Sequence, residues 1–405
     1  MAAPSYLSAG EARRELGVTA QTLYAYVSRG MIRSEPAPDG SRTRRYHAED
    51  VRRLKDRKAA RRDPEQAARG ALRWGAPVLD SALTLVTDGR IFYRGHDAVE
   101  LARSRSVEQV AALLWTGAAD VPHGWFGAGV DGSAGEEDVG PLAAMQIELA
   151  RQEARDPATW DLRPERAART GARILERLTA VATEGSVDGE AETIPERLQR
   201  AWAPRAPEAE PLLRAAMILL ADHELNVASF TARCVASAGS TAYAAVSAGL
   251  GALQGSGHAR NTERVEALFR EAGAPEGART VVRARMRRGE PIPGFGHRLH
   301  PSGDPRAVEL LRLLREVRPA SPALALADAL VEAAEALMAE RPTVEVALVA
   351  LSLAFDLPPD APLVLFALGR TLGLVAHAVE QYRCGEAIRP RARYTGAVPA
   401  ELGSR

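Results

Sequence analysis

The sequence has little cysteine, few aromatic residues and no uninterrupted apolar run of membrane-spanning length. Cys234 and Cys384 are the two cysteines among 405 residues, and their separation matches neither a zinc ligand set nor a redox pair. A reducing cytoplasm is the simplest setting, and the first residues lack the pattern of a secretory signal. The apolar stretch 363–379 is interrupted by Arg370 and His377. We therefore expect a soluble, cytoplasmic protein that contacts no membrane.

Neither sign of charge is in excess over the whole chain, since 52 Lys and Arg balance 52 Asp and Glu. The balance is uneven, however. Residues 1–62 hold 14 basic and 7 acidic side chains, and the other 343 residues hold 38 basic and 45 acidic ones. We interpret residues 1–62 as a separate basic domain and residues 63–78 as a linker.

Alanine and leucine dominate the rest of the chain. Long windows such as 322–340 and 344–355 keep apolar residues at three- and four-residue steps, which is typical of helices. A hairpin is predicted at 84–93, where an Asp-Gly turn separates two short β-prone segments. The sequence therefore predicts a mainly α fold with little sheet, long enough for two or three domains.

The basic N-terminal domain begins with two short predicted helices. Ser8 precedes Glu11 by three residues, which is the spacing of a capping box, and Gly17 can end the first helix. Thr19 can cap a second helix that ends near Gly30. Two helices joined by a tight turn result.

An Asp-Gly turn at residues 39–40, with arginines close on its C-terminal side, follows this helix pair and precedes a helix predicted at 48–57. The arrangement resembles the MerR-type helix-turn-helix with its arginine-bearing wing. The resemblance implies that the second helix enters the major groove and that the wing contacts phosphates. The residues then expected to contact DNA are Gln21, Thr22, Tyr24, Arg29, Arg42, Arg44 and Arg45. A basic unit used for protein contacts or solubility is the alternative.

The most informative segment is Pro293-Gly-Phe-Gly-His297-Arg-Leu-His-Pro-Ser-Gly-Asp304-Pro-Arg306. Glycines let backbone approach a ligand closely, an imidazole exchanges a proton near neutral pH, and a guanidinium binds a carboxylate through two N–H groups. These residue types suit a small dicarboxylate. The segment resembles the signature of the citrate synthase family, in which Gly-Phe-Gly-His is followed by Asp-Pro-Arg.

Further segments resemble the same family, in the same order along residues 80–400. They are 221–230, which resembles a helix-borne Asp-His-Glu segment; 251–258, a glycine-rich loop ending at His258; 366–377, a helix carrying Arg370; and 388–396, which contains Arg389. Residues 93–102 and 114–117 also fit. The resemblance implies an all-helical large domain at 79–235 and 346–400, with a small domain at 236–345.

The resemblance also implies the chemistry. A carboxylate removes a proton from the methyl or methylene carbon of acetyl-CoA or propionyl-CoA, an imidazole stabilises the enolate, and the carbon nucleophile attacks oxaloacetate. The implied catalytic residues are His258 for the enolate, His297 for the ketone and Glu345 for the base. The implied oxaloacetate ligands are His223, Arg306, Arg370 and, across a two-fold dimer, Arg389. Acyl-CoA is a substrate, and the chemistry needs no cofactor and no metal.

Four positions depart from the family pattern. The base is Glu345 where the family has Asp, and a displacement of roughly an ångström can cost about a hundredfold in rate. Ala259 and Arg260 replace two glycines, and Pro301 replaces a basic residue. Arg298 and Arg260 are the residues expected to contact CoA phosphates. Two hypotheses follow: a citrate synthase-type enzyme, or a ligand-sensing DNA-binding regulator whose larger domain has lost efficient condensation.

Overall fold

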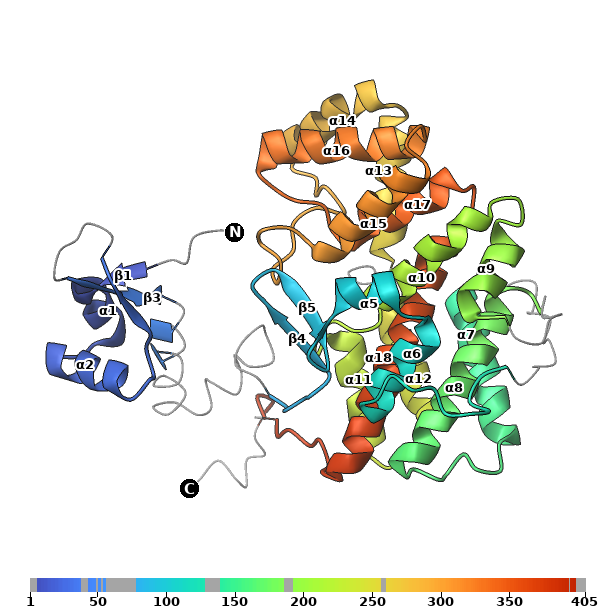
Figure 1. Cartoon of the computed structure of the whole chain (residues 1–405), viewed down its shortest axis with the longest axis horizontal. Helices are drawn as coiled ribbons and strands as arrows, with labels where there is room; N and C mark the ends of the chain where they lie inside the picture. Colours follow the sequence, from blue (N-terminus) through green and yellow to red (C-terminus); the bar gives the residue numbers. More distant parts are fainter. Residues whose placement is uncertain are drawn as a thin grey trace. The chain divides into compact units, whose positions relative to one another are not determined.

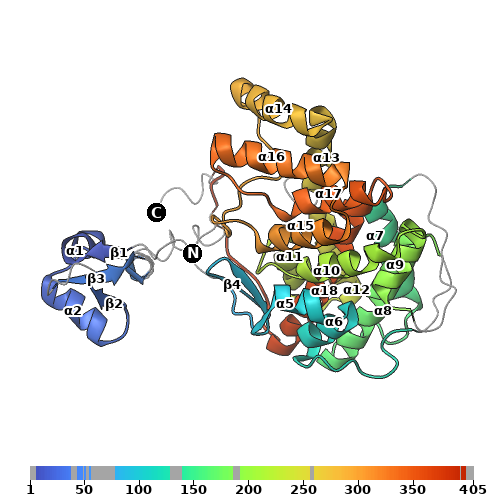
Figure 2. The same ribbon diagram turned by 45° about the horizontal axis from the view of Figure 1, so that its top comes forward.

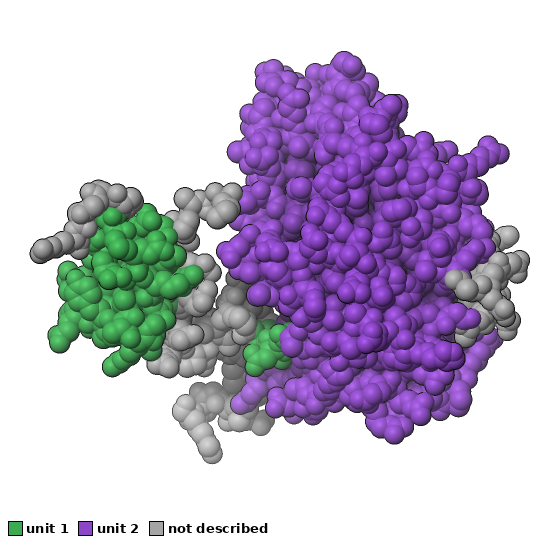
Figure 3. Space-filling model, in the orientation of Figure 1, with its two compact units in different colours: residues 1–81 green, residues 82–405 purple. Residues whose placement is uncertain are grey.

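The computed structural model describes residues 6–37, 43–48, 50–51, 54–55, 78–127, 139–185, 192–255, 260–392 and 394–397. The chain divides into two compact units, residues 1–81 and 82–405, which Figure 3 shows in different colours. The predicted boundaries of the N-terminal domain, the linker and the two larger domains stay predictions.

The first unit is a small sheet with two helices packed beside it. Its described elements are β1 (Tyr6–Ser8), α1 (Ala9–Leu16), α2 (Ala20–Ser28), β2 (Ser34–Pro36) and β3 (Arg44–His47). The strands are antiparallel in the order β1-β3-β2, so β3 lies in the middle. A small core that includes Leu16, Leu23, Ile32 and Tyr46 holds the unit together.

Local sequence determines where these helices begin and end, as predicted. Ser8 and Glu11 form the capping box of α1, and Gly17 ends it in the left-handed conformation at φ 60°. Thr19 caps α2 by accepting the backbone N–H of Thr22. Residues 48, 50, 51, 54 and 55 are helical, in agreement with the predicted third helix. The Asp-Gly turn at 39–40 lies outside the described residues.

The second unit opens with a small sheet and continues as helices (Figure 1). The sheet contains β4 (Thr84–Thr87), β5 (Arg90–Tyr93) and β6 (His96–Asp97). The helices are α5 (Ala98–Ser104), α6 (Val107–Thr116), α7 (Pro141–Arg155), α8 (Pro164–Ala182), α9 (Ile194–Trp202), the 3-10 turn η1 (Pro207–Ala209), α10 (Glu210–Leu219), α11 (Val227–Ser237), α12 (Ala242–Leu253), α13 (Asn261–Ala272), α14 (Pro275–Arg288), α15 (Pro305–Val317), α16 (Pro322–Met338), α17 (Val344–Ala354) and α18 (Ala361–Cys384). The mainly α prediction is confirmed.

The predicted hairpin is present. Thr84 pairs with Tyr93 and Thr87 with Arg90. Asp88 and Gly89 both have positive φ, at 51° and 72°, as a tight two-residue hairpin turn requires. The Asp88-Gly89 turn therefore fixes the register of the two strands, and this register places Tyr93 beside the candidate active site described below.

Helix α18 is the central helix of this unit. It is long and apolar enough to cross a membrane, with a mean hydropathy of 1.6, yet its most apolar window is entirely buried within the unit. Helices α6, α8, α10, α11 and α12 pack against it, while α13 to α17 gather at the top in Figure 1 and in the turned view of Figure 2. A helix that is apolar on all sides is stable when other helices surround it.

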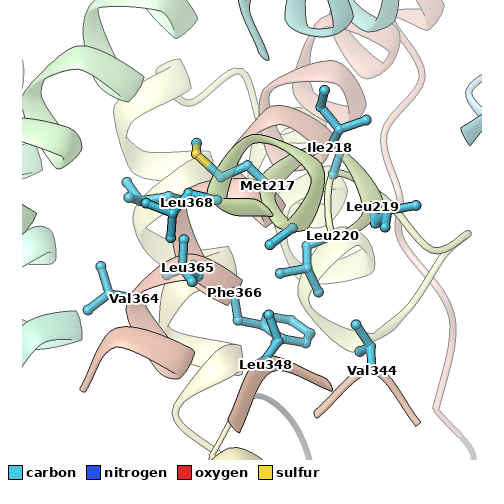
Figure 4. Close-up of a cluster of buried hydrophobic side chains, with 14 of the residues drawn as sticks. Met217, Ile218, Leu219, Leu220, Val344, Leu348, Val364, Leu365, Phe366 and Leu368 are labelled. Carbon is cyan, nitrogen blue, oxygen red and sulfur yellow. The ribbon is translucent and has the colours of Figure 1, made fainter. Parts of the chain in front are cut away.

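The end of α10, the start of α17 and the first third of α18 share one apolar cluster, drawn in Figure 4. Leu219 and Leu220 come from the end of α10, Val344 and Leu348 from α17, and Phe366 from α18, and each is at least 96% buried. A closely packed cluster of this kind is hard to compress. It therefore forms a rigid support for the polar residues of the same three helices, which are described in the next subsection.

Candidate active site

His223 lies in the connection between α10 and α11 and not on a helix, which corrects the prediction of a helix-borne segment. Helix α10 ends at Leu219, and Asn226 caps α11 by accepting two backbone N–H groups. Glu224, between them, has φ 55°, which few residues other than glycine adopt. The tight break in the helix turns His223 into the interior, where it is 8% exposed.

Two residues of the hairpin hold this connection in place. The Tyr93 hydroxyl donates to the carbonyl oxygens of Leu219 and Asp222, at 3.2 and 3.1 Å. Thr84 donates its hydroxyl to the Asp222 carboxylate at 2.6 Å. Burial raises the pKa of Tyr93 to about 12, so the hydroxyl keeps its proton.

Asp222 is also the partner of His377, a buried histidine for which the sequence predicted no role. His377 Nε2 lies 3.2 Å from Asp222 Oδ1, and both side chains are essentially fully buried. Ser229 donates a further hydrogen bond to the same oxygen. Nearby His377 and Arg370 lower the pKa of Asp222 against the opposing effect of burial. The residue before His223 is therefore a buried carboxylate with several partners.

The glycine-rich segment reaches the start of α17 through backbone pairing. The N–H of Gly296 donates to the carbonyl of Arg341 at 2.9 Å, and the N–H of Thr343 donates to the carbonyl of Gly294 at 2.8 Å. A side-chain methyl on Gly294 would lie 2.6 Å from Val346 Cγ2. The close approach therefore requires glycine, and it carries His297 towards Glu345.

Asp304 and Arg306 form a buried ion pair at the start of α15. Two side-chain hydrogen bonds join them, at 2.9 and 2.8 Å, and Asp304 also accepts the backbone N–H of Val344 at 3.1 Å. One carboxylate thus fixes the guanidinium and joins α15 to α17. Asp304 and its hydrogen bond raise the pKa of Arg306 against burial, so its charge is kept.

Arg370 is the second buried guanidinium, 1% exposed in the middle of α18. Its Nε donates to the carbonyl of Leu220 at 3.1 Å, and its Nη1 is buried without a hydrogen-bond partner among the described residues. A buried cationic donor without a partner is costly, and an anionic ligand would satisfy it.

Three imidazoles lie together between these groups. Ring centroids are 5.1 Å apart for His223 and His297, 5.0 Å for His223 and His300, and 5.1 Å for His297 and His300. Burial is the main cause that lowers the pKa of each of the three, and Arg306 lowers it further. For His300 the value falls to about 4. All three rings are therefore neutral near pH 7.

The hydrogen bond to His297 assigns its proton. The backbone N–H of Leu299 donates to His297 Nδ1 at 3.2 Å, so the neutral ring carries its proton on Nε2. A neutral N–H donor of this kind suits the polarisation of a carbonyl oxygen.

Glu345 is half-buried at the second position of α17. The hydroxyl of Thr343 donates to its Oε2, which leaves Oε1 without a partner among the described residues. Glu345 raises the pKa of His297 against the effect of burial. A carboxylate oxygen that is not engaged in a hydrogen bond is able to accept a proton.

The structure thus brings together His223, His297, Arg306, Glu345 and Arg370. It does not add the remaining predicted residues to this cluster. His258 lies outside the described residues, Arg389 is exposed beyond the end of α18, and Arg298 and Arg260 are exposed. Arg260 lies 3.5 Å from Glu263.

In the first unit, Gln21, Tyr24 and Arg29 are exposed on or just after α2. Thr22 is half-buried and hydrogen-bonded to Thr19. Arg44 on β3 donates to Ser34, and Arg45 stacks 3.9 Å over the ring of Tyr6. Arg42 lies outside the described residues. The DNA-contacting roles stay predictions.

Sequence reasoning missed several residues of the site. They are Tyr93, Asp222, His300, Asp304 and Thr343, for which no role was predicted. Asp304 and His300 belong to segment 293–306, which was already singled out for His297 and Arg306. Their polar side chains within that segment were a signal that could have identified them. The roles of Tyr93 and Asp222 depend on contacts between distant segments.

Comparison with protein families agrees with this geometry. Residues 134–391 match the family described as citrate synthase, C-terminal domain. This chain belongs to the citrate synthase family. Residues 7–62 match the MerR HTH family regulatory protein, so the first unit is a helix-turn-helix domain of that type. The recognised resemblance is confirmed in both parts.

Relatives within the citrate synthase family carry different names. Citrate synthase 2 of Bacillus subtilis is 27% identical over 353 residues, covering 80% of this chain and 94% of the relative. The 2-methylcitrate synthase of Mycobacterium tuberculosis is 29% identical over 348 residues, covering 75% and 84%. The crystal structure of citrate synthase from Thermotoga maritima aligns with a TM-score of 0.69 and 25% identity, covering 81% and 97%. The family relationship supports an enzyme of the condensing type.

Proposed function

We propose that this protein condenses acetyl-CoA or propionyl-CoA with oxaloacetate to give citrate or 2-methylcitrate and free CoA. The observation that carries the proposal is the convergence of five side chains in one cluster, in which His223, Arg306 and Arg370 are buried and His297 and Glu345 are half-buried. Two guanidiniums suit the two carboxylates of oxaloacetate, and the unpartnered Nη1 of Arg370 is a donor that such a carboxylate would satisfy.

Each step of the reaction has a candidate group. Glu345 Oε1 takes a proton from the acyl α-carbon, and the electron pair moves to the thioester oxygen, where His258 is the proposed donor. His297 Nε2–H polarises the ketone of oxaloacetate while the α-carbon forms the new carbon–carbon bond; the ketone π bond breaks, and its oxygen takes up one proton, equivalent to the one that Glu345 removed, to become a hydroxyl. Water then cleaves the thioester, which releases CoA and a carboxylate. Arg389 is proposed to complete the site of a partner subunit in a homodimer.

The test is release of free CoA thiol from acetyl-CoA, and separately from propionyl-CoA, with and without oxaloacetate. We expect oxaloacetate-dependent release that is lost in His297→Ala and His258→Ala. The acyl-CoA that reacts faster identifies the product, which is citrate for acetyl-CoA and 2-methylcitrate for propionyl-CoA. Absence of release, where oxaloacetate still raises the melting temperature, would overturn the condensation and leave a binding protein.

The second candidate is a regulator that binds DNA through the first unit and responds to a ligand in the second. The helix-turn-helix unit favours it, because Tyr24 on the second helix is 57% exposed although it is a large aromatic side chain. Glu345→Asp separates the two functions. A strong rise in turnover indicates an enzyme slowed by its extra methylene, whereas turnover that remains at background favours the regulator.

A further inference from the structure

His300 lies three residues after His297 and is 2% exposed. Its Nε2 is 2.8 Å from Nε2 of His223, at the distance of a hydrogen bond. The two residues are 77 positions apart in the chain, and none of the functions above uses His300.

A contact between two ring nitrogens holds one proton, which belongs to one ring and is accepted by the other. The remaining nitrogen of His300, Nδ1, is buried and has no hydrogen-bond partner among the described residues. If the proton of His300 sat on Nδ1, a buried N–H would go unsatisfied. An unfilled lone pair is more readily tolerated than an orphaned N–H. The favoured arrangement therefore has His300 donating from Nε2 to Nε2 of His223.

This arrangement determines the proton position on His223. Because Nε2 of His223 accepts, the neutral ring must carry its own proton on Nδ1. A proton added to Nε2 of His223 would place two N–H groups against each other, and the nearby Arg306 and Arg370 also disfavour added positive charge on that ring. His223 is thus a neutral donor at one defined atom.

We propose that His300 is a positioning residue that fixes His223 in the Nδ1–H tautomer and so presents a hydrogen-bond donor to oxaloacetate. The part that concerns oxaloacetate rests on the proposed function. With His297 held in the opposite tautomer by Leu299, the site has two neutral imidazoles that donate from different ring nitrogens. In a variant without the hydrogen bond from His300, His223 would be free to exchange between its two tautomers.

The tautomer can be measured directly in the ligand-free full-length protein. We would label histidine with ¹⁵N and record two-bond ¹H–¹⁵N correlations at pH 7.5, with His223→Gln to assign the signal. The expected pattern for His223 is protonated Nδ1 and unprotonated Nε2. The reverse pattern, or an equal mixture of both, would overturn the inference.

Two substitutions at His300 separate positioning from packing. His300→Gln keeps an N–H donor near the position of Nε2, whereas His300→Phe keeps the ring and loses the donor. We expect oxaloacetate affinity, measured by calorimetry, to fall at least tenfold in the His300→Phe variant and to stay within threefold of wild type in the His300→Gln variant. The Nδ1–H tautomer of His223 should be kept in the Gln variant and lost in the Phe variant. Equal affinity of wild type and Phe would overturn the positioning role.

Failure of the wild-type protein to bind oxaloacetate would overturn the proposed function instead. The tautomer spectrum needs no ligand, so it would still decide whether His300 controls His223. The two failures therefore give different results.

Discussion

The carboxylate of Asp304 binds the guanidinium of Arg306 through two hydrogen bonds, with the two side chains 0% and 4% exposed. Breaking a buried pair leaves an uncompensated charge, which typically costs about 3–5 kcal/mol. We expect Asp304→Asn to lower the free energy of unfolding by about that amount and to weaken oxaloacetate binding, because Arg306 would lose its orientation. Urea denaturation and calorimetry measure the two effects.

The matched control is a more exposed pair of the same type. Arg163 binds Asp161 two residues away, with the two side chains 70% and 24% exposed. Exposed pairs contribute about 0–1 kcal/mol, so Asp161→Asn should change stability little. Equal effects of the two substitutions would contradict the role given to Asp304.

Gly294 is expected to tolerate no side chain. It has φ +85°, and an added Cβ would lie 2.6 and 2.8 Å from side-chain atoms of Val346 and Val265. Backbone strain and overpacking together predict a loss of about 2–5 kcal/mol for Gly294→Ala. Gly289 has φ +71° with open space around its Cα, so Gly289→Ala should cost only about 1–2 kcal/mol. Thermal unfolding of the two variants side by side tests the difference.

Short-range features were predictable from the sequence. Ser8 and Thr19 cap their helices through groups three residues away, and the Asp-Gly turn sets the hairpin register locally. The family motifs also identified most of the charged cluster. Those features depend on neighbours in the chain or on residue order, both of which the sequence contains.

The contacts that orient the cluster were not predictable in the same way. Arg370 donates to the carbonyl of Leu220, 150 residues away, and His300 contacts His223 across 77 residues. The tight turn at Glu224 replaced the helix expected around His223, because Asn226 starts a new helix three residues later. Such pairings arise from packing of distant elements.

Acid should destabilise the fold through the imidazole cluster. An unfolded histidine binds its proton near pH 6.5, whereas folded His300 does so only near pH 4. Between these values the unfolded chain holds more protons, so stability falls as the pH is lowered through this window. The slope is at most about 1.4 kcal/mol per pH unit for each such ring.

The variant His300→Phe removes one of these rings. We expect a shallower loss of stability between pH 6.5 and 4.5 than in wild type, measured by urea denaturation at each pH. Arg103 and Arg312 hold the pKa of Glu309 at about 2, below the unfolded value of 4.5, so the stability that this carboxylate contributes is lost mainly below pH 4.5, beneath this window. An unchanged slope would show that His300 binds its proton at the same pH in the folded and the unfolded chain.

The wing arginine Arg44 is expected to contribute to DNA binding. Its guanidinium is held by hydrogen bonds to Ser34, at 3.1 and 3.0 Å, on the exposed side of β3. Losing one phosphate contact lowers the slope of log K against log salt by about 0.9. We expect Arg44→Gln to do so on a mixed-sequence duplex, and Arg166→Gln on α8 to leave the slope unchanged. Equal slopes for Arg44→Gln and wild type would remove Arg44 from the interface.

Glu345 is expected to be the general base, and Glu345→Gln tests it with nearly the same shape. The amide cannot take a proton, so oxaloacetate-dependent CoA release should fall at least about a hundredfold, within the range that general bases contribute. Oxaloacetate affinity should stay within threefold, because the dicarboxylate is assigned to the arginines and to His223. Glu332→Gln, on the exposed part of α16, is the control and should change neither quantity. A Gln variant that retained most of the turnover would place the base elsewhere, whereas a loss of oxaloacetate affinity equal to the loss of rate would assign Glu345 to binding.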